Sequence, residues 1–176
     1  AHKSVKEINA QMEQKTEKLL KEFKKQVGAL GYSFLTVDSK VVTNSSKYYC
    51  VMLSAFSSQA DGYQADAFYT IEKSTGNLLE LSNLFPENAD YVDVLTAEIK
   101  KQMRQNMKKD ENNVYFLDTD TPVALFDKID ENQQFYINGK DEIVICFAEG
   151  DVARASMGTL HFVIPQKVVK ELQKNE

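Results

Sequence analysis

The stretch that most constrains the fold is Gln134–Pro165, near the end of the chain. Asn138-Gly139 separates two apolar runs there, and this dipeptide is a strong signal for a two-residue β-hairpin turn. Residues 148–158 follow as an irregular, polar segment, whereas residues 159–164 alternate apolar and polar side chains. The terminal Pro165 suits the first turn of a helix. The stretch therefore predicts a hairpin, an exposed loop, a third strand and a short final helix.

The upstream sequence predicts two longer helices and several strands. Apolar residues spaced three and four apart mark a helix over residues 4–27 and a second helix from Asn88 to about Lys108. For the first helix we favour packing against a sheet over membrane-surface binding, because its polar face mixes Glu with Lys. Runs rich in Val, Tyr, Phe and Thr predict strands. These cover residues 32–43, 47–56 and 68–72, with a polar loop at 57–62, a short strand at 114–117 and core contacts from Leu125, Phe126 and Ile129.

The sum of these elements predicts an α+β fold. We expect a largely antiparallel sheet with an N-terminal helix, a central helix and a short C-terminal helix covering one face. The chain has 176 residues, 43% of them hydrophobic, which is enough to bury a sizeable core. We expect residues 1–31 to form an N-terminal helix that packs on the domain, and residues 32–176 to form a single globular unit.

The charge of the chain and its motifs favour a binding protein over an enzyme. The net charge of -5 and the pI of about 5.2 argue against a nucleic-acid partner and favour a basic protein partner. The sequence contains no nucleophile elbow and no phosphate-binding glycine loop. His161 alternates away from the apolar face of its strand, so a solvent-facing histidine is favoured over a general base. We predict no catalytic residue, no metal site and no cofactor.

Cys50 and Cys146 each lie in an apolar, strand-like run. Two buried, reduced thiols are the favoured interpretation, and a disulfide is the alternative, since sequence does not show whether the thiols approach each other. A metal pair is disfavoured because neither cysteine belongs to a Cys-x-x-Cys motif. The chain contains no apolar run of the roughly 20 residues needed to span a bilayer.

Several short motifs, in a fixed order from about residue 37 to residue 172, together resemble one family. A strand and turn lead to a Leu-Phe pair and a helix start, and a second strand pair precedes a Met-Gly pair and a final strand. This order resembles the extracytoplasmic domain of RsiV-type anti-sigma factors. The segments that carry the resemblance are Phe68–Gly76, Leu81–Phe85, Asp90-Tyr91, Asn132–Asn138, Glu142–Ile145, Met157-Gly158 and Phe162–Pro165.

The resemblance implies a sensor on the extracytoplasmic face of a bacterial cell membrane. Proteins of this family bind lysozyme through the outer domain, and binding permits regulated proteolysis that releases an extracytoplasmic-function sigma factor. The resemblance places the sigma-factor and membrane contacts in segments outside this chain. Lysozyme of the common type is strongly basic, which suits an acidic domain.

The same resemblance points to two partner-binding loops. In the family, the loop before the Met-Gly pair typically reads Val-Ala-Pro-Gly-Tyr-Met-Gly, whereas here Arg, Ala and Ser replace Pro, Gly and Tyr. The second loop is matched by its position between two strands. The candidate contact residues are Val152, Ala153, Arg154, Ala155, Ser156 and Met157 in the first loop and Ser57, Ser58 and Gln59 in the second.

Two alternatives stand beside the lysozyme sensor. A secreted or lipid-anchored cell-wall binding module of the same fold, with a different ligand, is favoured by the altered loop at residues 154–156. An enzyme is the third hypothesis, and no motif in the sequence supports it.

Overall fold

The computed structural model describes residues 3–27, 33–58, 62–117 and 124–173, and it folds as two compact units, Ala1–Leu79 and Glu80–Glu176. The predicted α+β class is confirmed, and all strand pairs in both units are antiparallel. The strands divide between two sheets, which the sequence analysis did not separate. The expected boundary after residue 31 lies outside the described residues, and the expectation of one globular unit over residues 32–176 stays a prediction.

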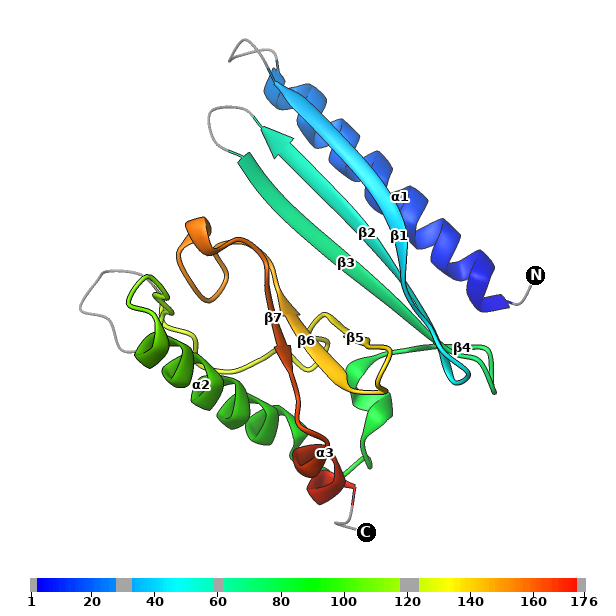
Figure 1. Ribbon diagram of the computed structural model, residues 1–176. Coiled ribbons are helices and arrows are strands. Elements are labelled where there is room, and N and C mark those ends of the chain that lie inside the picture. The colour runs from blue at the N-terminus through cyan, green and yellow to red at the C-terminus, as the bar shows by residue number, and fades with distance from the viewer. Residues whose placement is uncertain (1–2, 28–32, 59–61, 118–123, 174–176) are drawn as a thin grey trace. The chain divides into compact units, whose positions relative to one another are not determined.

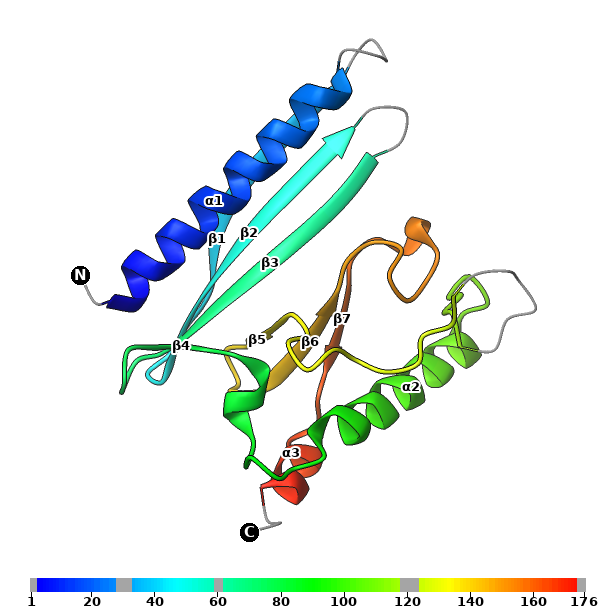
Figure 2. The ribbon, with the colours of Figure 1, turned by 180° about the vertical axis from the view of Figure 1, so that it is seen from behind.

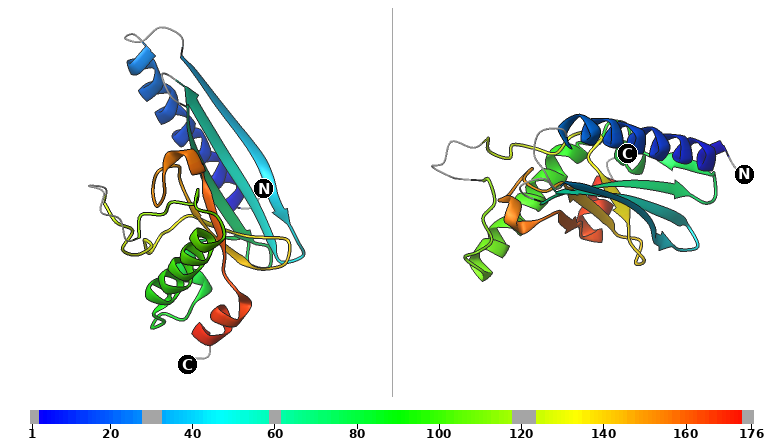
Figure 3. Two further views of the ribbon diagram at one scale, coloured as in Figure 1. Left: turned by 60° about the vertical axis from the view of Figure 1, so that its left-hand side comes forward. Right: turned by 90° about the horizontal axis from the view of Figure 1, so that it is seen from above.

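The first unit is one long helix against a four-stranded sheet. Figures 1 and 3 show the helix lying lengthwise over one face of the sheet. The strand order is β1-β2-β3-β4, so neighbours in sequence are neighbours in space. The elements are α1 (Lys3–Gln26), β1 (Phe34–Asn44), β2 (Tyr48–Ser58), β3 (Gly62–Glu72) and β4 (Asn77–Leu79).

The core of the first unit forms where the apolar stripe of α1 meets alternate residues of the sheet. Leu53 and Ala67 are directly paired across β2 and β3, and their side chains share a face with Tyr69 and Ile71. Ile8 of α1 packs into this cluster and is only 4% exposed. The predicted packing of this helix against a sheet is therefore confirmed.

The loop predicted at residues 57–62 is shorter than expected. Strand β2 continues through Ser58 and β3 begins at Gly62, so that these two residues form the last pair of the ladder. An added Cβ at Gly62 would lie 2.7 Å from the ring of Phe56, so this exposed ring would have to shift to accept it. The pairing of strand backbones outweighs the polar character of the side chains, which face solvent at the end of a sheet.

The second unit is a three-stranded sheet with two helices, seen from opposite sides in Figures 1 and 2. Its strand order is β5-β6-β7. Gln102 of the longer helix donates a hydrogen bond to the carbonyl of Val163 at the end of β7, at 3.0 Å. The elements are η2 (Leu81–Leu84), α2 (Tyr91–Lys109), β5 (Phe135–Ile137), β6 (Ile143–Phe147), η3 (Ala155–Met157), β7 (Leu160–Val163) and α3 (Gln166–Leu172).

The core of the second unit combines the α2 stripe with a row of aromatic rings. Leu95, Ile99 and Met103 of α2 are fully buried, as their helical spacing predicts. The ring of Phe147 packs edge-on against Phe162 and Phe126, with centroid distances of 5.8 and 5.4 Å. Phe126 and Ile129 are buried as predicted, whereas Leu125 is half exposed, which corrects the prediction that it fills the core.

The hairpin at Asn138-Gly139 is confirmed in place but not in type. The Asn138 carbonyl accepts a hydrogen bond from the Asp141 amide at 3.0 Å, and Asp141 has a φ of 58°. This is a three-residue loop that ends in a left-handed residue, instead of the predicted two-residue turn. The side chain of Asn138 accepts hydrogen bonds from the amides of Lys140 and Glu142, which fixes the longer loop.

Candidate functional site

The first predicted partner loop divides into a buried start and an exposed tip. Val152 and Ala153 are each only 2% exposed, whereas Arg154, Ala155 and Ser156 are exposed. Met157 is half buried. The loop is therefore presented to solvent by residues that are themselves part of the core.

Backbone hydrogen bonds hold the buried start of the loop. Ala153 forms an isolated antiparallel bridge with Tyr115, and this bridge replaces the short strand predicted at residues 114–117. The Phe116 amide donates to the Val152 carbonyl at 2.8 Å, and the Arg154 amide donates to the Val114 carbonyl at 3.3 Å. Two segments far apart in sequence thus fix where the tip begins.

A single turn of 3-10 helix, η3, forms the tip. The Met157 amide donates to the Arg154 carbonyl, and the Gly158 amide donates to the Ala155 carbonyl, each at 2.9 Å. The thioether of Met157 turns inward and accepts a hydrogen bond from the Val114 amide at 3.3 Å. The side chains left facing outward are those of Arg154, Ala155 and Ser156.

The glycine of the Met-Gly pair ends the tip in a conformation that other residues avoid. Gly158 has φ 66° and ψ -156°, a region that is essentially restricted to glycine. The backbone reverses there and enters β7 two residues later. The Met-Gly pair that carried part of the resemblance therefore has a physical role in closing the loop.

The tip backbone suits the family pattern even though its side chains differ. Arg154 has φ -55°, which lies inside the range that proline fixes. Ala155 does not have a positive φ, so this position does not need glycine. Of the three positions, Ser156 differs most in side-chain size from the family pattern, which has a tyrosine there.

The second predicted partner loop lies at the far end of β2 and β3. Ser57 and Ser58 belong to strand β2, and Gln59 lies outside the described residues. Beside them, the rings of Phe34 and Phe56 contact each other at a centroid distance of 5.7 Å while remaining 54% and 37% exposed. The sequence analysis missed this aromatic pair. The feature that reveals the pair is the strand register, which places both rings on one face of the sheet.

The two predicted loops belong to different units. The first lies in Glu80–Glu176 and the second in Ala1–Leu79, so each loop is placed only within its own unit. Within each unit the structure presents exposed side chains on an ordered strand end or helical turn.

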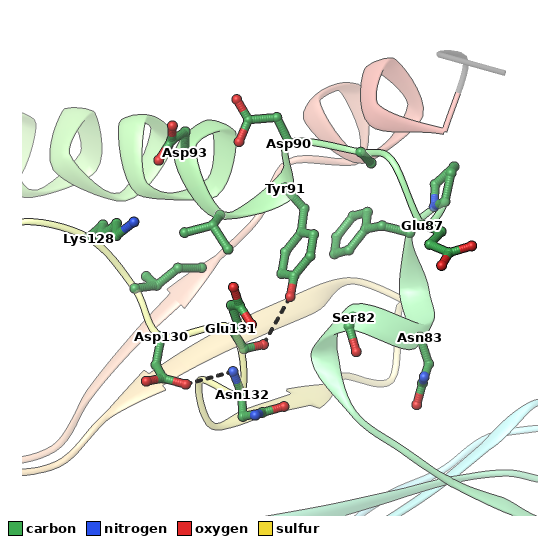
Figure 4. A pocket seen from close by; sticks show the side chains of 15 residues that line it. Ser82, Asn83, Glu87, Asp90, Tyr91, Asp93, Lys128, Asp130, Glu131 and Asn132 are labelled. Carbon is green, nitrogen blue, oxygen red and sulfur yellow. Dashed lines mark hydrogen bonds between the residues drawn. The ribbon is translucent and has the colours of Figure 1, made fainter.

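An open pocket of about 940 Å³ lies in the second unit, between the start of α2 and residues 128–132. Figure 4 shows Asp90 and Asp93 on the α2 side and Asp130 and Glu131 on the opposite side. The Tyr91 phenol donates a hydrogen bond to the Glu131 carbonyl at 3.1 Å. Sequence reasoning did not identify this pocket, because its walls come from segments about forty residues apart.

Tyr91 sits in a strongly acidic environment. Burial raises the pKa of its phenol, and the nearby carboxylates of Glu131, Asp130 and Glu80 raise it further. Its ring is stacked on Phe85, with a centroid distance of 5.1 Å and an interplanar angle of 8°. The phenol therefore stays neutral, and the pocket carries the negative charge of its carboxylates.

The described residues show no group of side chains arranged as metal ligands. Within residues 3–27, 33–58, 62–117 and 124–173, no three His, Cys, Asp or Glu side chains are grouped to hold a metal ion. His161 is exposed as predicted, and its ring contacts Tyr136 edge-on at 5.8 Å. Cys50 and Cys146 are both buried and form no disulfide, as predicted.

No helix among the described residues has the length and apolarity needed to cross a membrane.

The fold is of the α+β class, with exposed loops held by buried residues. Residues 82–167 match the family described as "Protein of unknown function (DUF3298)". The chain is also 33% identical over 171 residues to "Anti-sigma-V factor RsiV" of Bacillus subtilis (strain 168). Together these matches support the resemblance of the chain to the ectodomain of RsiV-type proteins.

The extent of these matches fits the two units. The DUF3298 match falls entirely inside the second unit, Glu80–Glu176, whereas the match to RsiV covers 96% of this chain. The chain spans 59% of the length of RsiV, so it corresponds to part of that protein.

Two solved structures share the fold. A DUF3298-family member from Bacteroides fragilis NCTC 9343 is 19% identical, with a TM-score of 0.64, over 96% of this chain and 66% of its own. A DUF3298-family protein from Pseudomonas aeruginosa PAO1 is 13% identical, with a TM-score of 0.58, over 87% of this chain and 68% of its own. At these identities the likeness concerns the fold alone.

Proposed function

We propose that this chain is the ligand-binding ectodomain of a membrane anti-sigma factor, on the outer face of a bacterial cell membrane, and that its ligand is lysozyme. In this proposal the domain binds without catalysis. Binding permits regulated proteolysis, which releases an extracytoplasmic-function sigma factor held by a segment outside this chain. The observation that supports it most is the 33% identity to RsiV across 96% of the chain.

The geometry of the first loop supports the same proposal. The tip from Arg154 to Ser156 projects from a bridge and a glycine-closed turn, so little loop entropy remains to be lost on binding. A short, rigid, exposed tip suits insertion into a cleft of a partner. The acidic charge of the chain favours a basic partner such as common-type lysozyme.

Calorimetry of the chain with common-type lysozyme, at micromolar protein and low salt, tests the proposal directly. We expect binding, with an affinity limited by Ser156, because an aromatic anchor at an interface contributes about 2 kcal/mol or more. Ser156→Tyr should therefore tighten binding by up to roughly thirtyfold. Arg154→Pro suits the φ at this position but removes the amide that donates to the Val114 carbonyl, so it should not bind more tightly than the parent.

Two matched variants make this test specific. Gln166→Tyr adds the same aromatic side chain to an exposed position at the start of α3 and should leave the affinity unchanged. Ser156→Ala removes the hydroxyl without adding contact area and should change the affinity little. If neither the parent nor Ser156→Tyr gives a binding signal when it is titrated with lysozyme, lysozyme is overturned as the ligand.

A second candidate function rests on the exposed residues of the tip. Arg154, Ala155 and Ser156 offer a cation and a hydroxyl where the family pattern offers a tyrosine. A different ligand, bound by a secreted or lipid-anchored cell-wall module, would explain this change. The triple variant with Pro, Gly and Tyr at residues 154–156 decides between the two. A triple variant that folds normally and still fails to bind lysozyme favours the second candidate.

A further inference from the structure

Positive charge gathers on one helix of an otherwise acidic chain. Helix α1 contains seven lysines and four glutamates, a net charge of +3. Since the whole chain carries -5, the residues outside α1 carry -8. Within α1 the excess lies in its second half, where residues 15–25 contain five lysines and two glutamates.

Three lysines of this half, Lys21, Lys24 and Lys25, lie on the side of α1 that points away from the sheet, whereas Lys15 lies on the same side as Ile8. At 3.6 residues per turn, Lys18, Lys21 and Lys25 follow one line along the helix, and Lys24 lies beside them. Lys21 is opposite the stripe of Ile8 and Met12 that packs on the sheet, whereas Lys18 lies to one side of that stripe.

Few of these cations are neutralised within the unit. Lys18 reaches Glu22 at 4.0 Å in a pair that is exposed on both sides. Lys21, Lys24 and Lys25 have no ion pair or hydrogen bond within the part of the chain that the structure describes. Their charge is therefore available to an external anion.

Exposed apolar side chains flank the same lysines. Leu20 is 42% exposed and Val27 is 37% exposed, and they lie four residues before and three residues after Lys24. Together with Glu17, the side chains of Leu20, Lys21, Lys24 and Lys25 line a shallow groove. Lysines beside exposed apolar groups are the combination found on helices that lie at a membrane surface. The mixture of Glu with Lys disfavours such binding for the helix as a whole, but in residues 15–25 the lysines outnumber the glutamates. A soluble polyanion would pair with the lysines but would leave Leu20 in water.

We propose that α1 docks on an anionic lipid bilayer through the basic patch, defined as Leu20, Lys21, Lys24, Lys25 and Val27. The lysines are attracted to the lipid phosphates, and Leu20 and Val27 enter the headgroup region. Common-type lysozyme is basic and is repelled by the basic patch, so lysozyme binds elsewhere on the chain. Docking on the bilayer is therefore independent of lysozyme binding. The packing of α1 on the sheet is unaffected, since the patch lies on the opposite face.

Cosedimentation of the whole chain with lipid vesicles tests this proposal. We expect binding to equimolar phosphatidylglycerol and phosphatidylcholine vesicles, and none to phosphatidylcholine alone. The variant Lys21→Gln/Lys24→Gln/Lys25→Gln should lose nearly all binding, because each lysine near an anionic surface changes partitioning roughly fivefold. Glutamine keeps the helix propensity, and circular dichroism checks that α1 stays folded.

A charge-matched control separates the patch from net charge. Lys140→Gln/Lys167→Gln/Lys170→Gln removes the same charge from exposed positions of the second unit and should bind vesicles like the parent. The proposal would be overturned if both triple variants lost vesicle binding to the same extent. It would also be overturned if the parent bound neither kind of vesicle.

The apolar contribution distinguishes a bilayer from a soluble polyanion. Leu20→Ala should weaken binding to anionic vesicles severalfold and leave binding to polyphosphate unchanged. The proposal of a bilayer would be overturned if Leu20→Ala left vesicle binding unchanged and polyphosphate abolished that binding by competition. The ligand of the patch would then be a soluble polyanion.

Discussion

Single residues fix the shape of the candidate loop. Gly158 adopts a backbone conformation that side chains disfavour, while Arg154 adopts one that proline shares. The loop thus keeps its path although three consecutive side chains differ from the family pattern. The position of the Met-Gly pair could be read from sequence. The dihedral angles that make Arg tolerable in place of Pro could not be read from sequence, since they depend on the bridge between Ala153 and Tyr115.

Gly158→Ala should destabilise the chain by about 1–3 kcal/mol, because an alanine Cβ is strained at φ 66° and ψ -156°. Gly139→Ala is the control, since Gly139 lies outside the positive-φ residues and has open space around its Cα. It should be neutral or slightly stabilising. Urea unfolding of the two variants measures the difference, and equal stabilities would contradict the assigned strain.

The turn at Asn138 shows the same limit of local reasoning. The Asn-Gly pair located the hairpin, and the residue with positive φ proved to be Asp141. The pairing of Ile137 with Ile143 requires five intervening residues, and Asn138 satisfies their amides. The register of the two strands, set by the core, selects the turn type.

At the scale of elements, periodicity predicted the helices and most strands. The stripes of α1 and α2 were predicted because buried positions recur every three to four residues. The extent of β2 and β3 was underestimated, since polar residues at a strand end are compatible with backbone pairing. Leu125 was misplaced because a single apolar residue in an irregular segment carries no periodicity.

The contribution of Glu98 on α2 to the stability of the fold depends on pH. Burial alone would raise the pKa of its carboxyl, but hydrogen bonds from Lys101 at 2.7 Å and Gln102 at 3.1 Å outweigh burial and lower it. A lowered pKa in the folded state means that the carboxylate stabilises the fold above the ordinary glutamate pKa. This contribution is lost as the pH falls through the folded-state value.

Glu98→Gln should therefore cost about 1 kcal/mol at neutral pH, and the difference from the parent should shrink in acid below the ordinary pKa of a glutamate. Glu111→Gln, at an exposed position just after α2, should change stability little across the same range. Denaturant unfolding at a series of pH values measures both. A Glu98→Gln deficit that grows in acid would contradict the assigned direction.

At the scale of the whole molecule, charge is divided unevenly. The residues outside α1 carry -8, and several of their carboxylates gather at the pocket beside Tyr91. Such a surface attracts a basic partner over distances of about a Debye length. The basic patch of α1 attracts anions instead.

If lysozyme is the partner, its association rate with this chain should fall several-fold as ionic strength rises from about 0.01 to 0.2 M, because salt screens the long-range attraction. The dissociation rate should change much less. Stopped-flow or surface-based kinetics over a salt series measures both rates. An association rate that is insensitive to salt would show that charge does not steer the encounter.

The sequence alone determined the α+β class, the helices, the antiparallel pairing of neighbouring strands, the buried thiols and the family resemblance. These follow from local periodicity and from residue order, which a linear chain carries in full. Tertiary structure alone decided the division into two sheets, the bridge that holds Ala153, the exposed Phe34–Phe56 pair and the pocket walls. Periodicity states which face of an element is buried, but the partner that buries it comes from elsewhere in the chain.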